Sequence, residues 1–192
     1  MTMWELRAQC LECERCGLAA GRTNVVFGCG NEDADIMFVG EGPGKNEDEQ
    51  GIPFVGRAGE LLDSYLAAVG LDRSDVYIAN IVKCRPPQNR DPAPEEQEAC
   101  IPWLREQFRI INPKLIVCLG RISAKRMISD KILVTKEHGR IFRKGGVLMM
   151  ATFHPAALLR NPANKPDALD DFKKIVRLAE GNFEPEALND PS

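Results

Sequence analysis

Four short apolar runs recur along the chain, and turn-forming residues bound each of them. They cover residues 36–40, 76–82, 115–120 and 147–153. Runs of this length between polar segments are typical of buried β-strands. The hydrophobic pattern therefore predicts a central sheet of four strands.

Segments with helical spacing separate these runs. Apolar residues follow a helical period from Leu61 to Val69, and Gly70 supplies a stop signal. A second helix is predicted from Pro94 to Ile111, with acidic residues at its start, where the helix dipole favours them. Further helical segments are expected after Gly120 and from Asp167 to Ala179. This alternation predicts an α/β fold of three layers, in which helices cover both faces of a mostly parallel sheet.

The length of 192 residues, with 44% hydrophobic and 28% charged residues, suits one globular domain. We expect residues 1–180 to form it and residues 181–192, which are polar and acidic, to form a loose tail. The N-terminus carries no secretory signal, and no apolar run approaches the roughly 20 residues of a membrane span. We therefore expect a monomeric, cytoplasmic protein that does not engage a membrane.

The net charge of −3 is unusual for a protein that binds nucleic acid. Basic residues nevertheless gather between Lys114 and Lys144, where nine Lys or Arg residues stand against two acidic ones. Such segregation is enough to build a local basic face that contacts phosphates. A solvated charged surface would give the same pattern.

Seven cysteines in a reducing compartment favour metal ligation or buried thiols over disulfides. Three are separated by two residues each and two lie far downstream: Cys10, Cys13, Cys16, Cys84 and Cys100. A structural zinc ribbon would normally bring a second close pair, and thiolates from separate positions suit an iron–sulfur cluster at least as well. Cys118 lies inside an apolar run and is expected to be a small buried hydrophobe. Cys29 has no predicted role.

Three predicted strands run into polar, turn-rich segments that begin at Gly40, Asn80 and Phe153. Because ligands of such sheets bind beyond the carboxyl ends of the strands, these segments should meet at one site. The first is not a Walker loop, since its two glycines are one residue too close and Asn46 replaces the required Ser or Thr. A nucleotide cofactor is therefore not expected.

The polar segments carry four motifs: Glu41-Gly-Pro-Gly, Pro53-Phe-Val-Gly, Asn80-Ile-Val-Lys-Cys-Arg-Pro-Pro-Gln-Asn-Arg and His154-Pro-Ala-Ala-Leu-Leu-Arg-Asn-Pro. Together they resemble the motifs of the family 4 uracil-DNA glycosylases, over about residues 13–176. The resemblance implies hydrolysis of the N-glycosidic bond of uracil flipped out of single- or double-stranded DNA. The product would be an abasic site for base excision repair.

The resemblance also implies a four-iron four-sulfur (4Fe-4S) cluster. The positions that match its ligands are Cys13, Cys16, Cys84 and Cys100. Cys10 departs from the family's pattern, because its spacing would let it compete for the cluster.

Recognition of the base is assigned by the resemblance to two residues. Phe54 is similar to the family's stacking ring, and Asn80 to the residue that reads the edge of uracil. An Asn amide can donate to a uracil carbonyl and accept from the ring N–H, whereas cytosine presents a mismatched pattern. Gly42 stands where better-known uracil glycosylases have Asp, and we expect it to line the substrate site. A core aromatic and a strand-end turn residue are the alternative interpretations of Phe54 and Asn80.

Cleavage leaves negative charge on the departing uracil and positive character on the sugar. His154 is expected to donate to the uracil oxygen that gains charge. A carboxylate suits the task of positioning water against the cationic sugar, and Glu41 is the best candidate. Glu47 and Asp48 are further candidates.

Contacts to DNA are predicted in two places. Leu158, Leu159 and Arg160 offer two apolar wedges and a cation, although a core pair at the start of a helix would show the same pattern. Phosphate contacts are predicted for a basic set: Lys83, Arg85, Arg90, Arg121 and Lys125. A sliding clamp is a candidate protein partner.

Two other classes of function stay open at this point. An iron–sulfur electron carrier would have the cluster without the Phe54, Asn80 and His154 constellation. A non-catalytic module that binds uracil-containing DNA, or one stabilised by zinc, is the other alternative.

Overall fold

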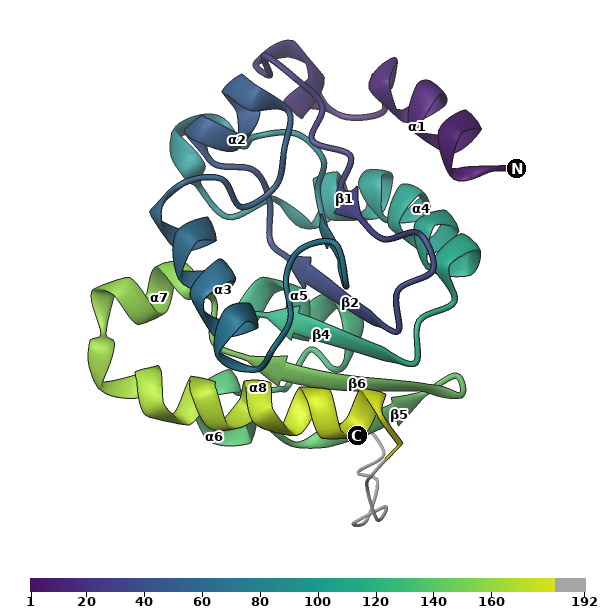
Figure 1. Ribbon diagram of the computed structural model, residues 1–192. Coiled ribbons are helices and arrows are strands. Elements are labelled where there is room, and N and C mark those ends of the chain that lie inside the picture. Colours follow the sequence, from purple (N-terminus) through teal and green to yellow (C-terminus); the bar gives the residue numbers. More distant parts are fainter. Residues whose placement is uncertain (182–192) are drawn as a thin grey trace.

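The computed structural model describes residues 1–181 and shows a twisted sheet between two layers of helices (Figure 1). Its helices are α1 (Met3–Leu11), α2 (Lys45–Gln50), α3 (Arg57–Ala68), α4 (Pro94–Ile111), α5 (Arg121–Met127), α6 (Val134–Glu137), α7 (Pro155–Arg160) and α8 (Lys165–Ala179). Its strands are β1 (Cys29–Gly30), β2 (Ile36–Gly40), β3 (Tyr77–Asn80), β4 (Leu115–Leu119), β5 (Ile141–Lys144) and β6 (Val147–Thr152). Short 3-10 turns lie at Gly17–Ala20, Pro87–Asn89 and Pro162–Asn164.

The sheet has the order β1-β3-β2-β4-β6-β5. Its four central strands, β3, β2, β4 and β6, are parallel and correspond to the four predicted apolar runs. The predicted α/β fold is confirmed, but the predicted count of four strands is wrong, because β1 and β5 add antiparallel edges. β1 has only two residues, and two of the four residues of β5 are exposed, so neither leaves a long apolar run in the sequence.

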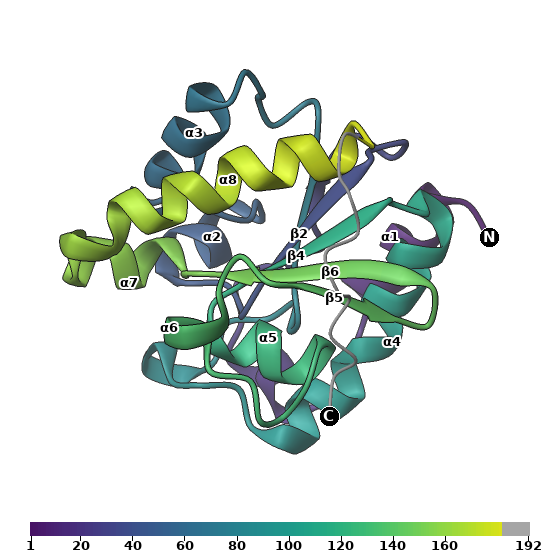
Figure 2. The same ribbon diagram turned by 90° about the horizontal axis from the view of Figure 1, so that it is seen from below.

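Alternate residues of each central strand enter opposite cores. In β4, Ile116 and Cys118 pack with α1, α4 and α5, whereas Leu115, Val117 and Leu119 pack with α3 and α8. Figure 2 shows this division, with α3 and α8 on one side of the sheet and α4 and α5 on the other. The predicted helical cover on both faces is therefore confirmed, as is the buried position of Cys118.

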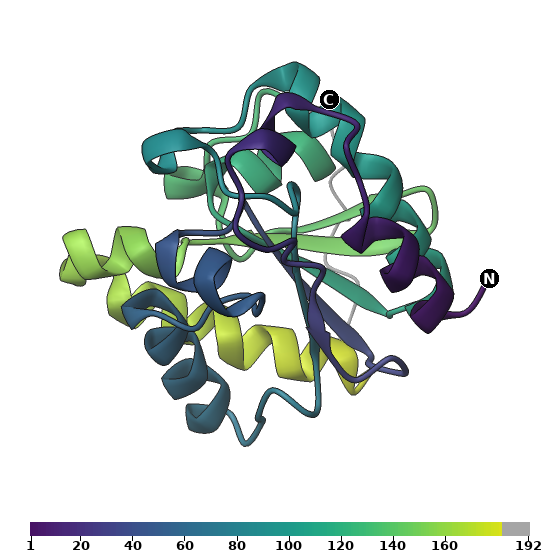
Figure 3. The same ribbon diagram turned by 90° about the horizontal axis from the view of Figure 1, so that it is seen from above.

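The N-terminal arm packs outside the sheet. Its helix α1 lies along α4, as two views show (Figures 1 and 3). The arm is then anchored to α2 by the buried Asp48, whose Oδ1 accepts from the backbone N–H groups of Thr23 at 2.9 Å and Asn24 at 3.2 Å. The segment with the closely spaced cysteines lies between α1 and this anchor, and it shares a cavity with Cys84, which follows β3, and Cys100 of α4.

The sequence also predicted a loose C-terminal tail and no membrane-spanning segment. Residues 182–192, nearly all of the predicted tail, lie outside the described residues. No helix within residues 1–181 combines the length and the apolar character needed to cross a bilayer.

Candidate active site and cysteine cavity

A cleft lies beyond the carboxyl ends of β2, β3 and β6 and encloses about 1760 Å³ of space that is open to solvent. The segments that follow these strands supply much of its wall, as the sequence predicted. Nine of the predicted site residues line it: Glu41, Gly42, Glu47, Phe54, Asn80, Arg90, Arg121, His154 and Arg160. The fold thus gathers residues that are more than 100 positions apart in the chain.

Gly40, the last residue of β2, lets Phe54 and Asn80 approach the end of the strand. A Cβ atom on Gly40 would lie 2.4 Å from the Asn80 Oδ1 and 2.7 Å from the Phe54 Cζ, closer than atoms can pack. The Oδ1 of Asn80 is buried and makes no hydrogen bond within the described residues. A buried acceptor without a partner is costly, so this atom is suited to accept a hydrogen bond from a ligand.

His154 lies opposite Phe54, with the two ring centroids 5.6 Å apart. Burial, together with the positive charge of Arg160, lowers the pKa of His154 to about 4, so the ring is neutral at pH 7. Its Nδ1 accepts from the backbone N–H of Ala156 at 3.1 Å, at the start of α7. A neutral imidazole that accepts through Nδ1 carries its proton on Nε2, which is thereby the donor.

Glu41 is a half-buried carboxyl in the same cleft. Burial raises its pKa, and the negative charge of Asp91 adds to this, while Arg121 and Arg160 oppose it. Raising the pKa makes a carboxylate a better proton acceptor, provided that it stays ionised.

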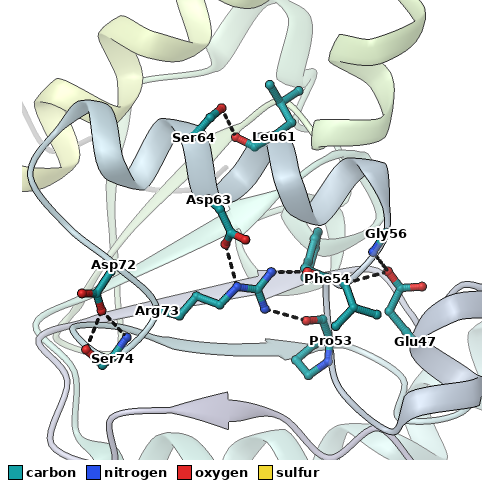
Figure 4. Close-up of polar contacts among 11 residues, drawn as sticks. Glu47, Pro53, Phe54, Gly56, Leu61, Asp63, Ser64, Asp72, Arg73 and Ser74 are labelled. Carbon is teal, nitrogen blue, oxygen red and sulfur yellow. Dashed lines mark hydrogen bonds and ion pairs between the residues drawn. The ribbon is translucent and has the colours of Figure 1, made fainter.

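The two other predicted carboxylates differ from Glu41. The Oε1 of Glu47 accepts from the backbone N–H groups of Val55 at 3.3 Å and Gly56 at 3.5 Å (Figure 4). The carboxylate of Asp48 is buried and holds the N-terminal arm, and it does not line the cleft. The prediction of a catalytic role for Asp48 is therefore wrong.

A second, smaller cavity lies between the arm, the segment after β3, and α4. Five cysteines line it: Cys10, Cys13, Cys16, Cys84 and Cys100. Within residues 1–181, no three of the Cys, His, Asp or Glu side chains are grouped closely enough to hold a single metal ion. The thiols are instead distributed around a cavity, which is the arrangement that a cluster with one thiolate per iron requires.

N–H groups point at three of these sulfur atoms. The backbone N–H of Lys83 donates to the Cys100 Sγ at 3.2 Å, and the Trp103 Nε1–H donates to the Cys13 Sγ at 3.3 Å. The Arg22 guanidinium donates to the Cys84 Sγ at 3.6 Å. Hydrogen bonds to the sulfur atoms are among the features that tune an iron–sulfur centre.

Burial favours the neutral form of the three buried thiols of the cavity, Cys10, Cys84 and Cys100. Burial raises the pKa of Cys100 to about 11 and that of Cys10 to about 12. Burial also raises the pKa of Cys84. Cys10 is completely buried within the core cluster that α1 and α4 share, whereas Cys13 and Cys16 are partly exposed.

Comparison with known proteins agrees with this geometry. Residues 27–178 match the uracil DNA glycosylase superfamily. The chain is 50% identical over 167 residues to the type-4 uracil-DNA glycosylase of Thermotoga maritima, which covers 85% of this chain and 87% of the relative. It is 46% identical over 176 residues to the type-4 uracil-DNA glycosylase of Archaeoglobus fulgidus, which covers 88% of each. The chain belongs to the uracil-DNA glycosylase superfamily.

Within this superfamily, the similarity to type-5 enzymes is weaker. A type-5 uracil-DNA glycosylase of Pyrobaculum aerophilum is 33% identical over 112 residues, or 57% of this chain and 48% of the relative. The resemblance to family 4 that the sequence motifs predicted is confirmed by the type-4 relatives.

Two of the predicted DNA contacts of this glycosylase are wrong. Lys83 is only 1% exposed, and its Nζ donates to the buried Gln107 Oε1 at 2.6 Å beside the cysteine cavity. Leu158 is 2% exposed and belongs to the core beneath α7, so the alternative of a core residue is correct for it. Both side chains point inward, which the motif could not indicate.

Other predicted contacts stay at the surface of the glycosylase. Leu159 is partly exposed, Arg160 is exposed at the cleft, and the Arg85 Nε donates to the Asn89 Oδ1 at 2.8 Å. Five cations line the cleft: Lys45, Arg57, Arg90, Arg121 and Arg160. The roles of these residues on DNA stay predictions.

Several side chains that shape the two sites were not predicted. Arg22 and Trp103 serve the cysteine cavity, and Arg73 binds the backbone beside Phe54 (Figure 4). Each acts on a group far away in the sequence, and no local pattern marks it.

Proposed function

We propose that this chain is a uracil-DNA glycosylase that hydrolyses the N-glycosidic bond of uracil flipped out of single- or double-stranded DNA, leaving an abasic site for base excision repair. The observation that carries the proposal is the buried, unpaired Oδ1 of Asn80 in a cleft with Phe54 and the donor of His154. An electron carrier would not need these three side chains in a cleft separate from the cysteine cavity.

Recognition of uracil follows from the chemistry of Asn80. Its Oδ1 would accept the N3–H of uracil, and its amide would donate to the O4 carbonyl. Cytosine presents an acceptor at N3 and a donor at the neighbouring amino group, so both contacts would be repulsive. Phe54 would stack on the base, which an enzyme that flips its substrate out of the duplex requires.

Departure of the base would be assisted by His154. As the glycosidic bond breaks, negative charge grows on the uracil ring and its O2 atom. The Nε2–H of a neutral, fixed imidazole would donate to this oxygen more strongly in the transition state than in the ground state.

Water would be positioned by Glu41, whose carboxylate also suits the positive character that develops at the sugar. Glu47 is the weaker candidate, because one of its oxygens already accepts from two backbone N–H groups. Gly42 cannot be replaced by Asp without a shift, since a Cβ there would lie 2.7 Å from the Val82 Cγ2. This supports the assignment of the task to Glu41 in a chain that lacks the Asp of other uracil glycosylases.

The cysteine cavity would hold a 4Fe-4S cluster on Cys13, Cys16, Cys84 and Cys100. Bound there, the cluster would supply a covalent link between the N-terminal arm and the ends of β3 and α4. The N–H groups of Lys83 and Trp103 aimed at sulfur support this proposal. Cys10 lines the same cavity and is the candidate for an alternative ligand.

Contacts with DNA would be made around the mouth of the cleft. Arg160 on α7 lines the cleft, and the partly exposed Leu159 and Arg85 are each next in sequence to a lining residue. The five cations of the cleft would bind phosphates. We further propose a monomer in the cytoplasm, with a sliding clamp as a candidate partner.

The test is strand scission at the abasic site. Oligonucleotides that differ only by uracil, thymine or cytosine at one position are incubated with the protein and treated with alkali, as single strands and as duplexes. We expect scission only at uracil. Scission at none of the three would overturn the proposed function.

A further inference from the structure

Phe54 adopts a backbone conformation that disfavours its own side chain. Its φ angle is 53°, in the left-handed region. Within residues 1–181 the other non-glycine residues with positive φ are Gln88, Asn89 and Asn112. A bulky aromatic residue in this region persists only where its surroundings hold it there.

The conformation separates the two ends of the residue. The ring tip is directed at Gly40 and lies near His154, inside the cleft. The carbonyl is turned against helix α3, where a Cβ on Gly59 would lie 1.8 Å from the Phe54 oxygen. Only a glycine in α3 permits this contact, so the helix and the bend fit together tightly.

Arg73, in the loop between α3 and β3, binds this bend from outside the cleft (Figure 4). Its Nη2 donates to the Phe54 carbonyl and its Nη1 to the Pro53 carbonyl at 2.8 Å. Its Nε donates to Asp63 on α3 at 2.6 Å. One planar guanidinium therefore joins two successive carbonyls to the helix, which a lysine cannot reproduce in full.

The amide side of the same bend is held by another residue. The Oε1 of Glu47 accepts from the N–H groups of Val55 and Gly56, so residues 53–56 are fixed by a cation at their carbonyls and by an anion at their amides. Both side chains bind backbone groups of this bend rather than pack in the apolar core. Together these contacts hold the backbone on both sides of Phe54.

We propose that Arg73 is a positioning residue for base recognition, which holds Phe54 in its left-handed conformation so that the stacking surface is formed before uracil enters. This inference rests on the proposed function. Arg73 acts through Phe54 and does not touch the base. Loss of Arg73 lets the bend relax toward a common backbone conformation, and the ring then leaves its place beside Asn80 and His154.

The test is a double-mutant cycle between positions 73 and 54. Single-turnover excision from uracil-containing DNA and inhibition by free uracil are measured for wild type, Arg73→Ala, Phe54→Ala and the double variant. Arg73→Ala should weaken uracil inhibition and the excision rate at subsaturating enzyme by about ten-fold, within the range of base–aromatic stacking. In the Phe54→Ala background, the same change should have almost no effect.

Two further variants keep the test independent of folding. Arg73→Lys should recover part of the loss, and Asp63→Asn, which removes only the carboxylate that orients Arg73, should show a smaller loss of the same kind. Arg109→Ala is the matched control, because it removes an exposed arginine that pairs with Glu106 at 3.0 Å. Neither Arg109 nor Glu106 lines the cleft. Thermal unfolding is recorded for every variant.

The outcomes distinguish failure of the proposed role of Arg73 from failure of the proposed glycosylase function. An equal loss on replacing Arg73 with or without Phe54 would mean that Arg73 supports the fold only, and unchanged excision by Arg73→Ala would remove its role altogether. Either result overturns the inference while wild-type excision still supports the proposed function. A wild-type protein that excises no uracil overturns both.

Discussion

The cleft and the cysteine cavity use the same strand end in opposite ways. Asn80 ends β3 and faces the cleft with an oxygen that has no hydrogen-bond partner within residues 1–181, whereas Lys83 and Cys84, a few residues later, lie beside the cavity. The cavity's polar groups are paired: Lys83 with Gln107, and the N–H groups with sulfur. A site that binds a substrate reversibly can leave hydrogen-bonding groups without a protein partner, because the substrate supplies one. In a site that stabilises the fold, these groups are hydrogen-bonded within the protein.

Replacing a cysteine of the cavity should have the largest effect on metal content and stability. If the proposed cluster is present, Cys100→Ala is expected to lose iron, sulfide, the brown colour and most of the folded protein, because the proposed ligand on α4 is removed. Cys118→Ala is the matched control, since it truncates a fully buried cysteine outside the cavity. Iron and sulfide analysis with thermal unfolding measures both variants. Zinc alone in the wild type, or equal iron in Cys100→Ala, would contradict the cluster.

In the cleft, the largest effect on rate should come from His154. Loss of one preorganised donor typically costs about 10²–10³ in rate, so His154→Ala should slow single-turnover excision by that factor with little change in DNA binding. His138→Ala is the informative control, because the Nδ1 of His138 lies 2.9 Å from the buried Asp171 and supports the fold. It should lower the midpoint of thermal unfolding and spare the rate per folded molecule. Parallel losses of stability and rate in His154→Ala would contradict the catalytic role.

Asn80→Asp should have the next largest effect. A carboxylate keeps the acceptor but lacks the amide donor, so the uracil O4 would face a negative charge. Leaving such a buried polar contact unmade costs about 1–3 kcal/mol, which corresponds to a loss of roughly 5- to 150-fold in uracil excision. Excision of cytosine should rise relative to uracil. Oligonucleotides with uracil or cytosine at one position measure the ratio, and an unchanged ratio would show that another residue reads the base.

The smallest effect at neutral pH concerns the charge of His154. Burial lowers its pKa to about 4, below the usual value of about 6.5. The unfolded chain therefore binds a proton more readily than the folded one between these values, and the wild type loses stability as the pH falls from about 6.5 to about 4. His154→Asn should lose less stability over this range. Equal pH dependence of the unfolding free energy in both proteins would show that His154 is not held neutral.

The sequence could predict the central sheet and the composition of the cleft for physical reasons. Strands buried on both faces give continuous apolar runs, and the carboxyl ends of parallel strands meet at one edge. Helix α1 was missed, although Thr2 and Glu5 form a capping box whose spacing is visible in the sequence. The apolar residues of α1 do not give a clear helical period, so the sequence did not predict this helix.

Other features could not be read from a motif. A motif names residues but not the face that each presents. Lys83 was predicted at the surface and is buried, and for Leu158 the motif left both positions open although the side chain is buried. Arg73 escaped notice because two of its partners are main-chain carbonyls about 20 residues earlier. Such contacts leave no trace in the pattern of side chains.

The central claim is that the unpaired Oδ1 of Asn80 selects uracil by accepting its N3–H. Its most direct test compares single-turnover excision of uracil and of N3-methyluracil from otherwise identical single-stranded DNA, by wild type and by Asn80→Ala. The wild type should excise uracil and lose most of its rate on the methylated base, and the difference between the two bases should shrink in Asn80→Ala. Equal rates of the wild type on both bases would contradict the account.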